Sequence, residues 1–90
     1  MVWQVLLDPG ALRELDALDG SVRFRIWRFL YERLAQLKDP RSIGQALRGT
    51  ELGDLWKYRV GDYRIFARIL DDAVEIIVVE LGHRSRIYRR

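Results

Sequence analysis

The hydrophobic pattern of this 90-residue chain changes its period once, and the change limits the folds that the chain can form. From residue 21 to residue 37, apolar side chains recur every three or four positions, which is the spacing of one face of an α-helix. After residue 54, apolar runs are separated by two-residue polar breaks, Gly61-Asp62 and Asp71-Asp72, a pattern typical of antiparallel hairpins. The second part is therefore expected to be a three-stranded antiparallel meander. Its predicted strands are Leu55–Val60, Tyr63–Leu70 and Ala73–Leu81.

The start of the chain predicts a strand followed by a short helix. Val2–Leu7 is a brief run rich in Val and Leu, which is typical of a strand. Asp8 is a good helix cap, and Pro9 suits the first helical turn because an N–H there would have no helical partner. Leucines at positions 12, 15 and 18 then predict a helix that ends near Asp19-Gly20.

A second, longer helix is expected to have Ser21 as its N-terminal cap and to stop at Asp39-Pro40. Residues 41–54 contain three glycines and no clear period, so they predict a connecting loop. One strand, an antiparallel helix pair and a meander together predict an α+β fold with both helices on one sheet face. A chain of this length has room for one core, so residues 1–90 are expected to form a single domain. The apolar stripe of the second helix consists of Val22, Ile26, Phe29, Leu30, Leu34 and Leu37.

Composition excludes several classes of protein. The chain has no cysteine, which removes disulfides, thiolate catalysis and cysteine-ligated zinc, and its single histidine makes a metal site unexpected. It has no glycine-rich phosphate loop or dinucleotide fingerprint, so no cofactor is expected. Its apolar runs are too short to span a membrane and its first residues do not resemble a signal peptide, so a cytoplasmic protein is expected.

Charge is unevenly distributed in the C-terminal third. Residues 82–90 contain four arginines and no acid, whereas the acids of this region gather in residues 71–80. The net charge is +3 and the pI about 9.7, so the excess of positive charge belongs to the molecule as a whole. Such a surface favours nucleic acid or an acidic protein as partner.

Alternation along the first two meander strands puts four cations on one side of the sheet and leaves the side under the helices apolar. We call this surface the basic face; it carries Lys57, Arg59, Arg64 and Arg68. A half-solvated sheet normally has polar residues outward, which is an alternative explanation. However, these two strands place no carboxylate among the four cations, and like charges so close are unfavourable unless an anion neutralises them. The pattern therefore favours a surface that binds phosphate.

Three residues beyond the last predicted strand carry groups that suit phosphate chemistry. Arg84 is expected at the edge of the basic face. His83 is either a loop histidine without a special role or a proton donor or acceptor near a phosphate. Tyr88 is either a core aromatic under the tail or a phenol that neighbouring cations make more acidic, as a general base requires. Lys57, Arg64 and Arg84 are the groups expected around a pentavalent phosphorane.

Three blocks of the sequence stand out by their residues and their spacing. They are Leu47-Arg48-Gly49, the stretch LWKYRVGDYRI at residues 55–65, and Gly82-His83-Arg84 followed by Ile87-Tyr88. Together they resemble the RelE toxin family of the RelE/ParE superfamily, over essentially the whole chain. The resemblance implies a toxin of a type II toxin–antitoxin system. Its activity would be that of a ribosome-dependent endoribonuclease, or mRNA interferase, which cleaves messenger RNA in the ribosomal A site and inhibits translation.

The resemblance also implies a mechanism, in which the 2′-OH of the message attacks the adjacent phosphate without a metal ion. Arg64 and Arg84 match active-site arginines that stabilise phosphate charge or assist the leaving 5′-oxygen. Lys57 matches one of two lysines of the family, whereas Leu55 occupies the position of the other. Tyr88 matches the tyrosine proposed as general base, and the histidine of the Gly-His-Arg block is expected to share proton transfer. The implied catalytic set is Lys57, Arg64, His83, Arg84 and Tyr88.

The partners implied by the family are the ribosome, its messenger RNA and a small antitoxin. An acidic antitoxin segment that folds on binding would suit the cationic surface, in a toxin–antitoxin hetero-oligomer. Trp27 and Tyr31 lie off the apolar stripe of the second helix, where they either pack against the first helix or form an antitoxin groove. The remaining arginines are expected to contact RNA or ribosome backbones, where charge matters more than geometry. These arginines are Arg59, Arg68, Arg86, Arg89 and Arg90.

Two other functions stay open. A ParE-like toxin has the same fold but poisons DNA gyrase without RNA chemistry, and members of that branch generally lack the arginine and tyrosine cluster. The presence of Arg64, Arg84 and Tyr88 therefore argues against it. The second alternative is a basic module that binds RNA or the ribosome but has no catalytic activity.

Overall fold

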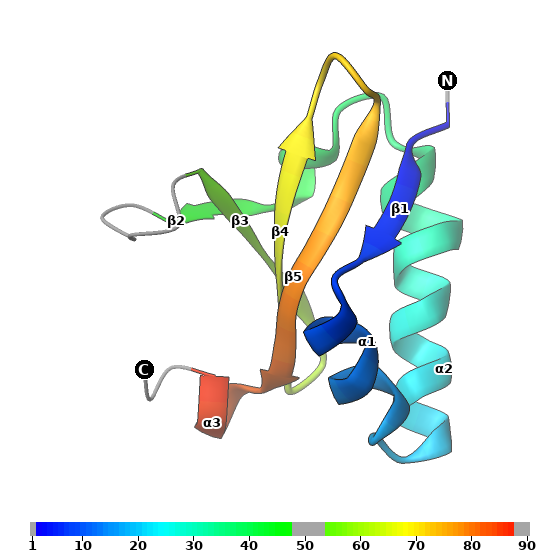
Figure 1. The fold of residues 1–90 in the computed structure, drawn as a ribbon, viewed down its shortest axis with the longest axis vertical. Coiled ribbons are helices and arrows are strands. Elements are labelled where there is room, and N and C mark those ends of the chain that lie inside the picture. Colours follow the sequence, from blue (N-terminus) through cyan, green and yellow to red (C-terminus); the bar gives the residue numbers. More distant parts are fainter. Residues whose placement is uncertain (1, 48–53, 88–90) are drawn as a thin grey trace.

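A single sheet organises the chain, with two helices packed on one of its faces (Figure 1). The computed structural model describes residues 2–47 and 54–87, and the sheet has the strand order β1-β5-β4-β3-β2. β1 runs parallel to β5, and all other neighbouring strands are antiparallel. The strands are β1 Gln4–Leu7, β2 Gln45–Leu47, β3 Leu55–Val60, β4 Tyr63–Leu70 and β5 Glu75–His83.

The predicted meander is confirmed. β3 and β4 begin and end at the predicted residues, with the turn Gly61-Asp62 between them. β5 starts at Glu75 and continues to His83, so Gly82 lies within the strand and not at its exit. A β-bulge interrupts the pairing of β4 with β5 between Phe66 and Ala67. The bulge changes which β5 side chains share a face beyond this point.

Both predicted helices are present. The helical segments are α1 Pro9–Asp16, α2 Gly20–Arg28, its continuations Phe29–Arg33 and Leu34–Gln36, the short turn Pro40–Ile43, and α3 Arg84–Ile87. The continuation of α2 widens into a π-helical turn and then tightens into a 3-10 turn. The cap of α2 is Asp19 and not the predicted Ser21, because the Asp19 carboxylate accepts hydrogen bonds from the N–H and the hydroxyl of Ser21. α3 was not predicted, since four residues are too few to produce a helical period.

The prediction of a loop over residues 41–54 is wrong for its first part. β2 lies there, paired with the outer edge of β3. Three residues cannot produce an alternating pattern, and β2 forms because the β3 backbone offers unpaired groups at that edge. Residues 48–53 lie outside the described part of the chain, and with them Arg48 and Gly49 of the first motif.

The main core lies between the helices and the sheet. Ile26, Leu30 and Leu34 of the predicted stripe are fully buried, and Val22, Phe29 and Leu37 pack against them. The sheet contributes fully buried residues from β4 and β5. These are Ile65 and Ala67 of β4, with Ile76, Val78 and Leu81 of β5.

The two aromatic residues off the helix stripe have different environments. Trp27 packs against the main core, and its ring stacks on that of Tyr31 with centroids 5.0 Å apart. Tyr31 is 40% exposed, and its hydroxyl donates to the carbonyl oxygen of Val5 at 3.3 Å. Packing therefore accounts for Trp27, whereas Tyr31 retains a solvent-facing surface.

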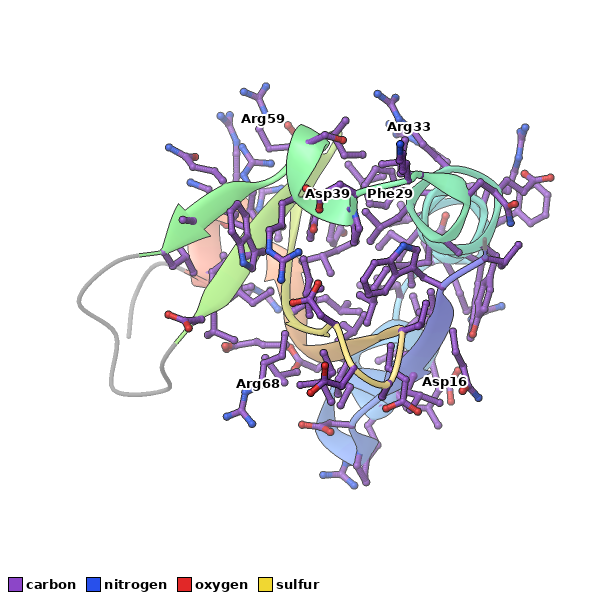
Figure 2. All side chains as sticks on the ribbon, turned by 90° about the horizontal axis from the view of Figure 1, so that it is seen from above. Asp16, Phe29, Arg33, Asp39, Arg59 and Arg68 are labelled. Carbon is purple, nitrogen blue, oxygen red and sulfur yellow. The ribbon has the colours of Figure 1, made fainter. Side chains whose placement is uncertain are left out.

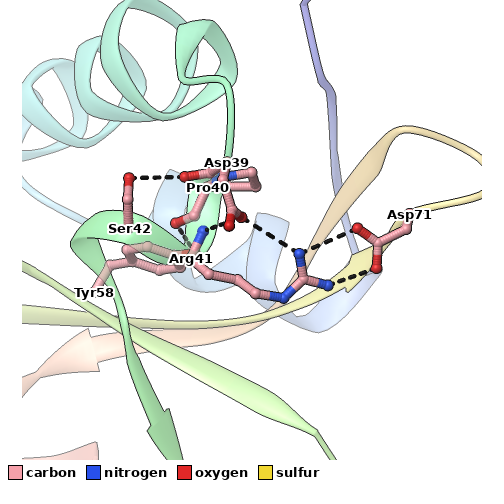
Figure 3. A network of polar contacts seen from close by, with 6 residues as sticks. All are labelled: Asp39, Pro40, Arg41, Ser42, Tyr58 and Asp71. Atoms are coloured by element: carbon pink, nitrogen blue, oxygen red, sulfur yellow. Dashed lines mark hydrogen bonds and ion pairs between the residues drawn. The ribbon is translucent and has the colours of Figure 1, made fainter.

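Tyr58 ties the short turn before β2 to the sheet (Figure 3). Its hydroxyl donates to the carbonyl oxygen of Pro40 at 2.7 Å from a buried position, and burial raises the pKa of this phenol. We expect Tyr58→Phe to lower the free energy of unfolding by about 1–3 kcal/mol, because a buried carbonyl loses its donor. Urea unfolding measures the change, with Tyr31→Phe as control because that hydroxyl is partly exposed. Equal losses in the two variants would contradict the prediction.

Arg41 joins the same turn to the connection between β4 and β5 (Figure 3). Its two terminal nitrogens donate to the Asp71 oxygens at 3.1 and 2.6 Å, and these bonds lower the pKa of Asp71 below its usual 3.8. The ionised carboxylate therefore stabilises the fold at neutral pH, and this contribution disappears as the pH falls through the lowered pKa. We expect Asp71→Asn to unfold at lower urea concentration than wild type at pH 7 but at the same concentration near the acid limit. The control is Asp72→Asn, which makes the same change of charge at the neighbouring residue. If Asp71→Asn remains less stable than wild type in acid, the ion pair is excluded as the cause of the difference.

Candidate functional site

The basic face is on the side of the sheet opposite the main core. The register pairs Arg59 with Arg64 and Lys57 with Phe66, so both strands present these side chains on one surface. Tyr58, between the two β3 cations, is buried in the main core on the other side. The predicted placement of the cations on a common face is therefore confirmed.

The cations of this face differ in exposure. Arg59 and Arg68 extend outward into solvent from well-separated positions (Figure 2). Lys57 is partly buried between them. Arg64 is only 9% exposed. The face therefore combines exposed outer cations, which attract an anion from a distance, with inner cations that are partly or almost fully buried.

Arg64 is held in place by the turn that precedes it. Its Nη1 donates to the carbonyl oxygens of Gly61 and Tyr63, each at 3.0 Å. Gly61 has a φ of +59°, a conformation that L side chains rarely adopt, and it aims its carbonyl at the arginine through this turn. A guanidinium fixed by two backbone acceptors needs little reorganisation when it meets a developing negative charge.

The same turn also holds Arg84. The backbone N–H of Arg84 donates to the carbonyl oxygen of Asp62 at 2.8 Å. Its side-chain Nε lies 3.7 Å from an Asp62 carboxylate oxygen, and both side chains are exposed. One turn thus brings together two arginines that are twenty positions apart in the sequence, as the sequence motifs led us to expect.

Arg59 and Arg64 lie directly opposite each other on neighbouring strands. Like charges at directly opposed positions are destabilising in a sheet. The arrangement becomes favourable when an anion lies between or above the two guanidinium groups, because each then gains a charge-assisted hydrogen bond. A phosphate is one anion that could relieve this repulsion.

Glu80 also lies on the basic face, and the sequence pattern did not reveal it. The residue pairs with Phe66 and is buried. Strict alternation from Ile76 and Val78 would put Glu80 in the main core, but the bulge in the β4–β5 pairing turns it to the other side and puts Leu81 in the core. The face therefore contains one carboxylate, which offsets part of its positive charge.

His83 is on the other side of the sheet from Lys57 and Arg64. It pairs with Tyr63, and its ring meets the Tyr63 ring edge-on with centroids 5.4 Å apart. Its Nδ1 accepts the backbone N–H of Ser85 at 3.1 Å and lies 2.8 Å from the Ser85 hydroxyl oxygen. This geometry caps the start of α3 and does not direct the ring towards the cations.

The C-terminal segment beyond His83 crosses to the basic face. Arg86 is exposed on α3, and Ile87 packs against Phe66 and Leu55 on this side of the sheet. A cleft of about 590 Å³ opens beside α3, between it, the end of β5 and α1, and His83 and Arg86 are among the residues that line it. Tyr88, Arg89 and Arg90 lie outside the described residues, so their expected roles stay predictions.

The described residues also limit other kinds of site. Within residues 2–47 and 54–87, no group of three or more His, Cys, Asp or Glu side chains is placed to hold a metal ion. None of the helices in these ranges has both the length and the apolar surface needed to cross a membrane.

Several known proteins with similar sequence or structure are toxins. The family model for the ParE toxin of the type II toxin–antitoxin system parDE matches residues 5–88. Toxin RelG of Mycobacterium tuberculosis is 30% identical over 90 residues, 100% of both chains. The mRNA interferase toxin RelE of Escherichia coli is 30% identical over 86 residues, 96% of this chain and 87% of that protein. A chain in the crystal structure of the toxin–antitoxin complex RelBE2 from Mycobacterium tuberculosis matches with a TM-score of 0.83 and 26% identity, over 94% of each chain.

Proposed function

This chain belongs to the RelE/ParE family of toxins of type II toxin–antitoxin systems, and we propose that it is a ribosome-dependent endoribonuclease that cleaves messenger RNA in the ribosomal A site. One observation carries the proposal: the turn Gly61-Asp62 holds both Arg64 and Arg84 at the end of a face that also carries Lys57. Fixed cations in this number suit a phosphate whose charge increases during cleavage. The relative named mRNA interferase toxin RelE supports the same chemistry.

In the proposed reaction, the 2′-oxygen of the message forms a bond to the adjacent phosphorus and the bond to the 5′-oxygen breaks. The products are a 2′,3′-cyclic phosphate and a free 5′-hydroxyl, and the proton that the leaving 5′-oxygen gains comes from solvent water. Arg64 and Lys57 stabilise the phosphorane, and Arg84 does the same or assists the leaving 5′-oxygen. Tyr88 takes the proton of the 2′-OH. The ribosome brings the message to the face, so the toxin acts in the cytoplasm.

His83 was expected to share proton transfer, and its geometry supports a different contribution. Its Nδ1 is bonded to Ser85 and its ring packs on Tyr63, both away from Lys57 and Arg64. We propose that His83 acts mainly by fixing the start of α3, and thereby the position of Arg84. A proton-transfer role requires the ring to leave this arrangement when the message binds.

The exposed arginines add affinity for RNA backbone. We propose that Arg59 and Arg68 on the sheet and Arg86 on α3, which are all exposed, contact phosphates without reading sequence. Arg89 and Arg90 are assigned the same role from the sequence alone. The same positive surface suits an acidic antitoxin segment, and a solved relative is a toxin–antitoxin complex, so we propose an antitoxin as the second partner.

Mapping of messenger cleavage sites on ribosomes, with and without the protein, tests the proposed activity. The expected result is cleavage at defined positions within the A-site codon, with a cyclic or 3′-phosphate at the upstream end. Gyrase-dependent DNA breaks without messenger cleavage would instead support the ParE-like alternative. The family model that matches residues 5–88 describes a ParE toxin, so this alternative has to be tested. Ribosome binding without any cleavage would support the non-catalytic module.

A further inference from the structure

We propose that Leu55, Phe66 and Ile87 form an apolar anchor that positions the C-terminal helix α3 on the basic face, and that Leu55 is thereby a positioning residue of the candidate site. The anchor itself follows from packing, whereas its effect on catalysis rests on the proposed function. The proposal gives a physical role to the residue at which this chain departs from the second lysine of the family it resembles.

The anchor is a second hydrophobic cluster, separate from the main core. Leu55 on β3 is 2% exposed, Phe66 on β4 9% and Ile87 on α3 6%. Leu47 of β2 and Val79 of β5 pack against the edge of the cluster. Four strands and α3 therefore all contribute apolar side chains to a small region of a sheet face that is otherwise charged.

The cluster shares a face with the proposed active site. Leu55 and Lys57 are two positions apart on β3, so their side chains point to the same side of the sheet. Phe66 pairs directly with Lys57 in the register. The anchor thus forms one end of the basic face, and the Gly61-Asp62 turn with Arg64 forms the other.

α3 depends on such contacts because a helix of four residues is not stable by itself. Its start is fixed by the bond from the Arg84 N–H to the Asp62 carbonyl and by the bond from the Ser85 N–H to His83. Its end is fixed, among the described contacts, by the packing of Ile87 in the anchor. Gly82 lies beside this contact, and a Cβ added there would be in ordinary van der Waals contact with Ile87, 3.9 Å from its Cβ.

The position of α3 matters for the proposed chemistry. Arg84, a residue of the proposed catalytic set, lies on α3 itself, so the position of α3 sets the position of this arginine. A misplacement of about 1 Å in a reacting group can lower a rate by about 10²-fold. Loosening the anchor is therefore expected to lower kcat more than it raises KM, because the exposed arginines of the sheet, Arg59 and Arg68, remain in place.

The anchor also makes lysine unfavourable at position 55. A lysine there would have to bury its ammonium group among Phe66 and Ile87, or push α3 aside to reach water. Leu55→Lys introduces the lysine that the resemblance to the RelE family led us to expect at this position. We expect it to lower the activity of this chain, because the positively charged side chain removes the anchor.

Two measurements on the full-length protein test the proposal, one of α3 and one of catalysis. Trypsin cleavage after Arg84 and Arg86 under native conditions reports release of α3, independently of any ribonuclease activity. Initial rates of messenger cleavage, measured at varied concentrations of programmed ribosomes, give kcat and KM. The variants are Leu55→Lys and Ile87→Ala, with Ile69→Ala as a matched control because Ile69 is a strand residue that packs against the main core.

We expect both anchor variants to speed tryptic cleavage at these two sites and to lower kcat by about 10-fold or more, with the Ile69→Ala control close to wild type in both. Leu55→Met keeps an apolar side chain of similar volume, so its proteolysis should be as slow as that of wild type and its kcat close to that of wild type. This variant still tests the role of the position if Leu55→Lys fails to fold. Unchanged proteolysis in Ile87→Ala, or a kcat raised by Leu55→Lys, overturns the proposal. If the anchor variants are proteolysed faster but the wild type itself cleaves no messenger, the anchor is supported and the proposed function is rejected.

Discussion

Replacement of Arg64 with alanine is expected to lower the rate of messenger cleavage on ribosomes by about 10²–10³-fold, the loss typical when one preorganised donor to transition-state charge is removed. Arg64 is nearly buried, and its guanidinium is fixed by the carbonyl oxygens of Gly61 and Tyr63. A group held in this way stabilises new charge on the phosphorane without first losing side-chain freedom. Single-turnover cleavage on programmed ribosomes measures the effect.

Two further variants separate geometry from charge. Arg68→Ala makes the same change of charge on the same face, but at an exposed position, so it should weaken binding a few-fold and reduce the salt dependence without a large loss in kcat. Arg64→Lys keeps the charge but loses the planar fork, and it should recover only part of the activity. Urea unfolding of each variant confirms that the fold is intact. Equal losses in Arg64→Ala and Arg68→Ala would mean that Arg64 acts only as a surface charge.

The meander and the basic face were predictable because both depend on alternation. A strand with one face on the core must alternate, and the two-residue breaks fixed where β3 and β4 end. From that register alone, Lys57, Arg59 and Arg64 had to share a surface. The proximity of Arg84 to Arg64 also followed, since antiparallel pairing brings the end of β5 back to the start of β4.

The features that were missed arise where this local rule fails. The bulge after Phe66 reverses the alternation of β5, so Glu80 faces the cations although its neighbours in sequence suggest a core position. His83, taken together with Arg84 as one motif, lies on the other side because strand pairing continues to His83 and α3 begins only after it. The burial of Leu55 depends on Ile87, a contact between residues distant in sequence. Such a contact leaves no mark on local periodicity.

Omission of ribosomes is the second change with a large expected effect: cleavage of free messenger RNA by the purified protein should be at least about 10³-fold slower than cleavage on ribosomes. In-line attack requires the 2′-oxygen, the phosphorus and the 5′-oxygen to be aligned, and alignment of bound reactants can account for a large share of a rate enhancement. Lys57 and Arg64 supply positive charge on one face, and charge attracts any RNA backbone whatever its local geometry. We therefore expect the alignment to come from the A site.

The comparison uses one messenger at equal concentration, free and bound in the A site, with Arg64→Ala as the control for contaminating nucleases. If the wild type cleaves free RNA slowly but at the same nucleotides as on ribosomes, the basic face performs the chemistry and the ribosome contributes alignment. Rapid degradation of free RNA that Arg64→Ala abolishes would show instead that the protein aligns its own substrate. In that case the cleft beside α3, which Arg86 and His83 line, would be the place to seek the contacts that do so. The ribosome requirement thus distinguishes a face that only stabilises charge from a complete active site.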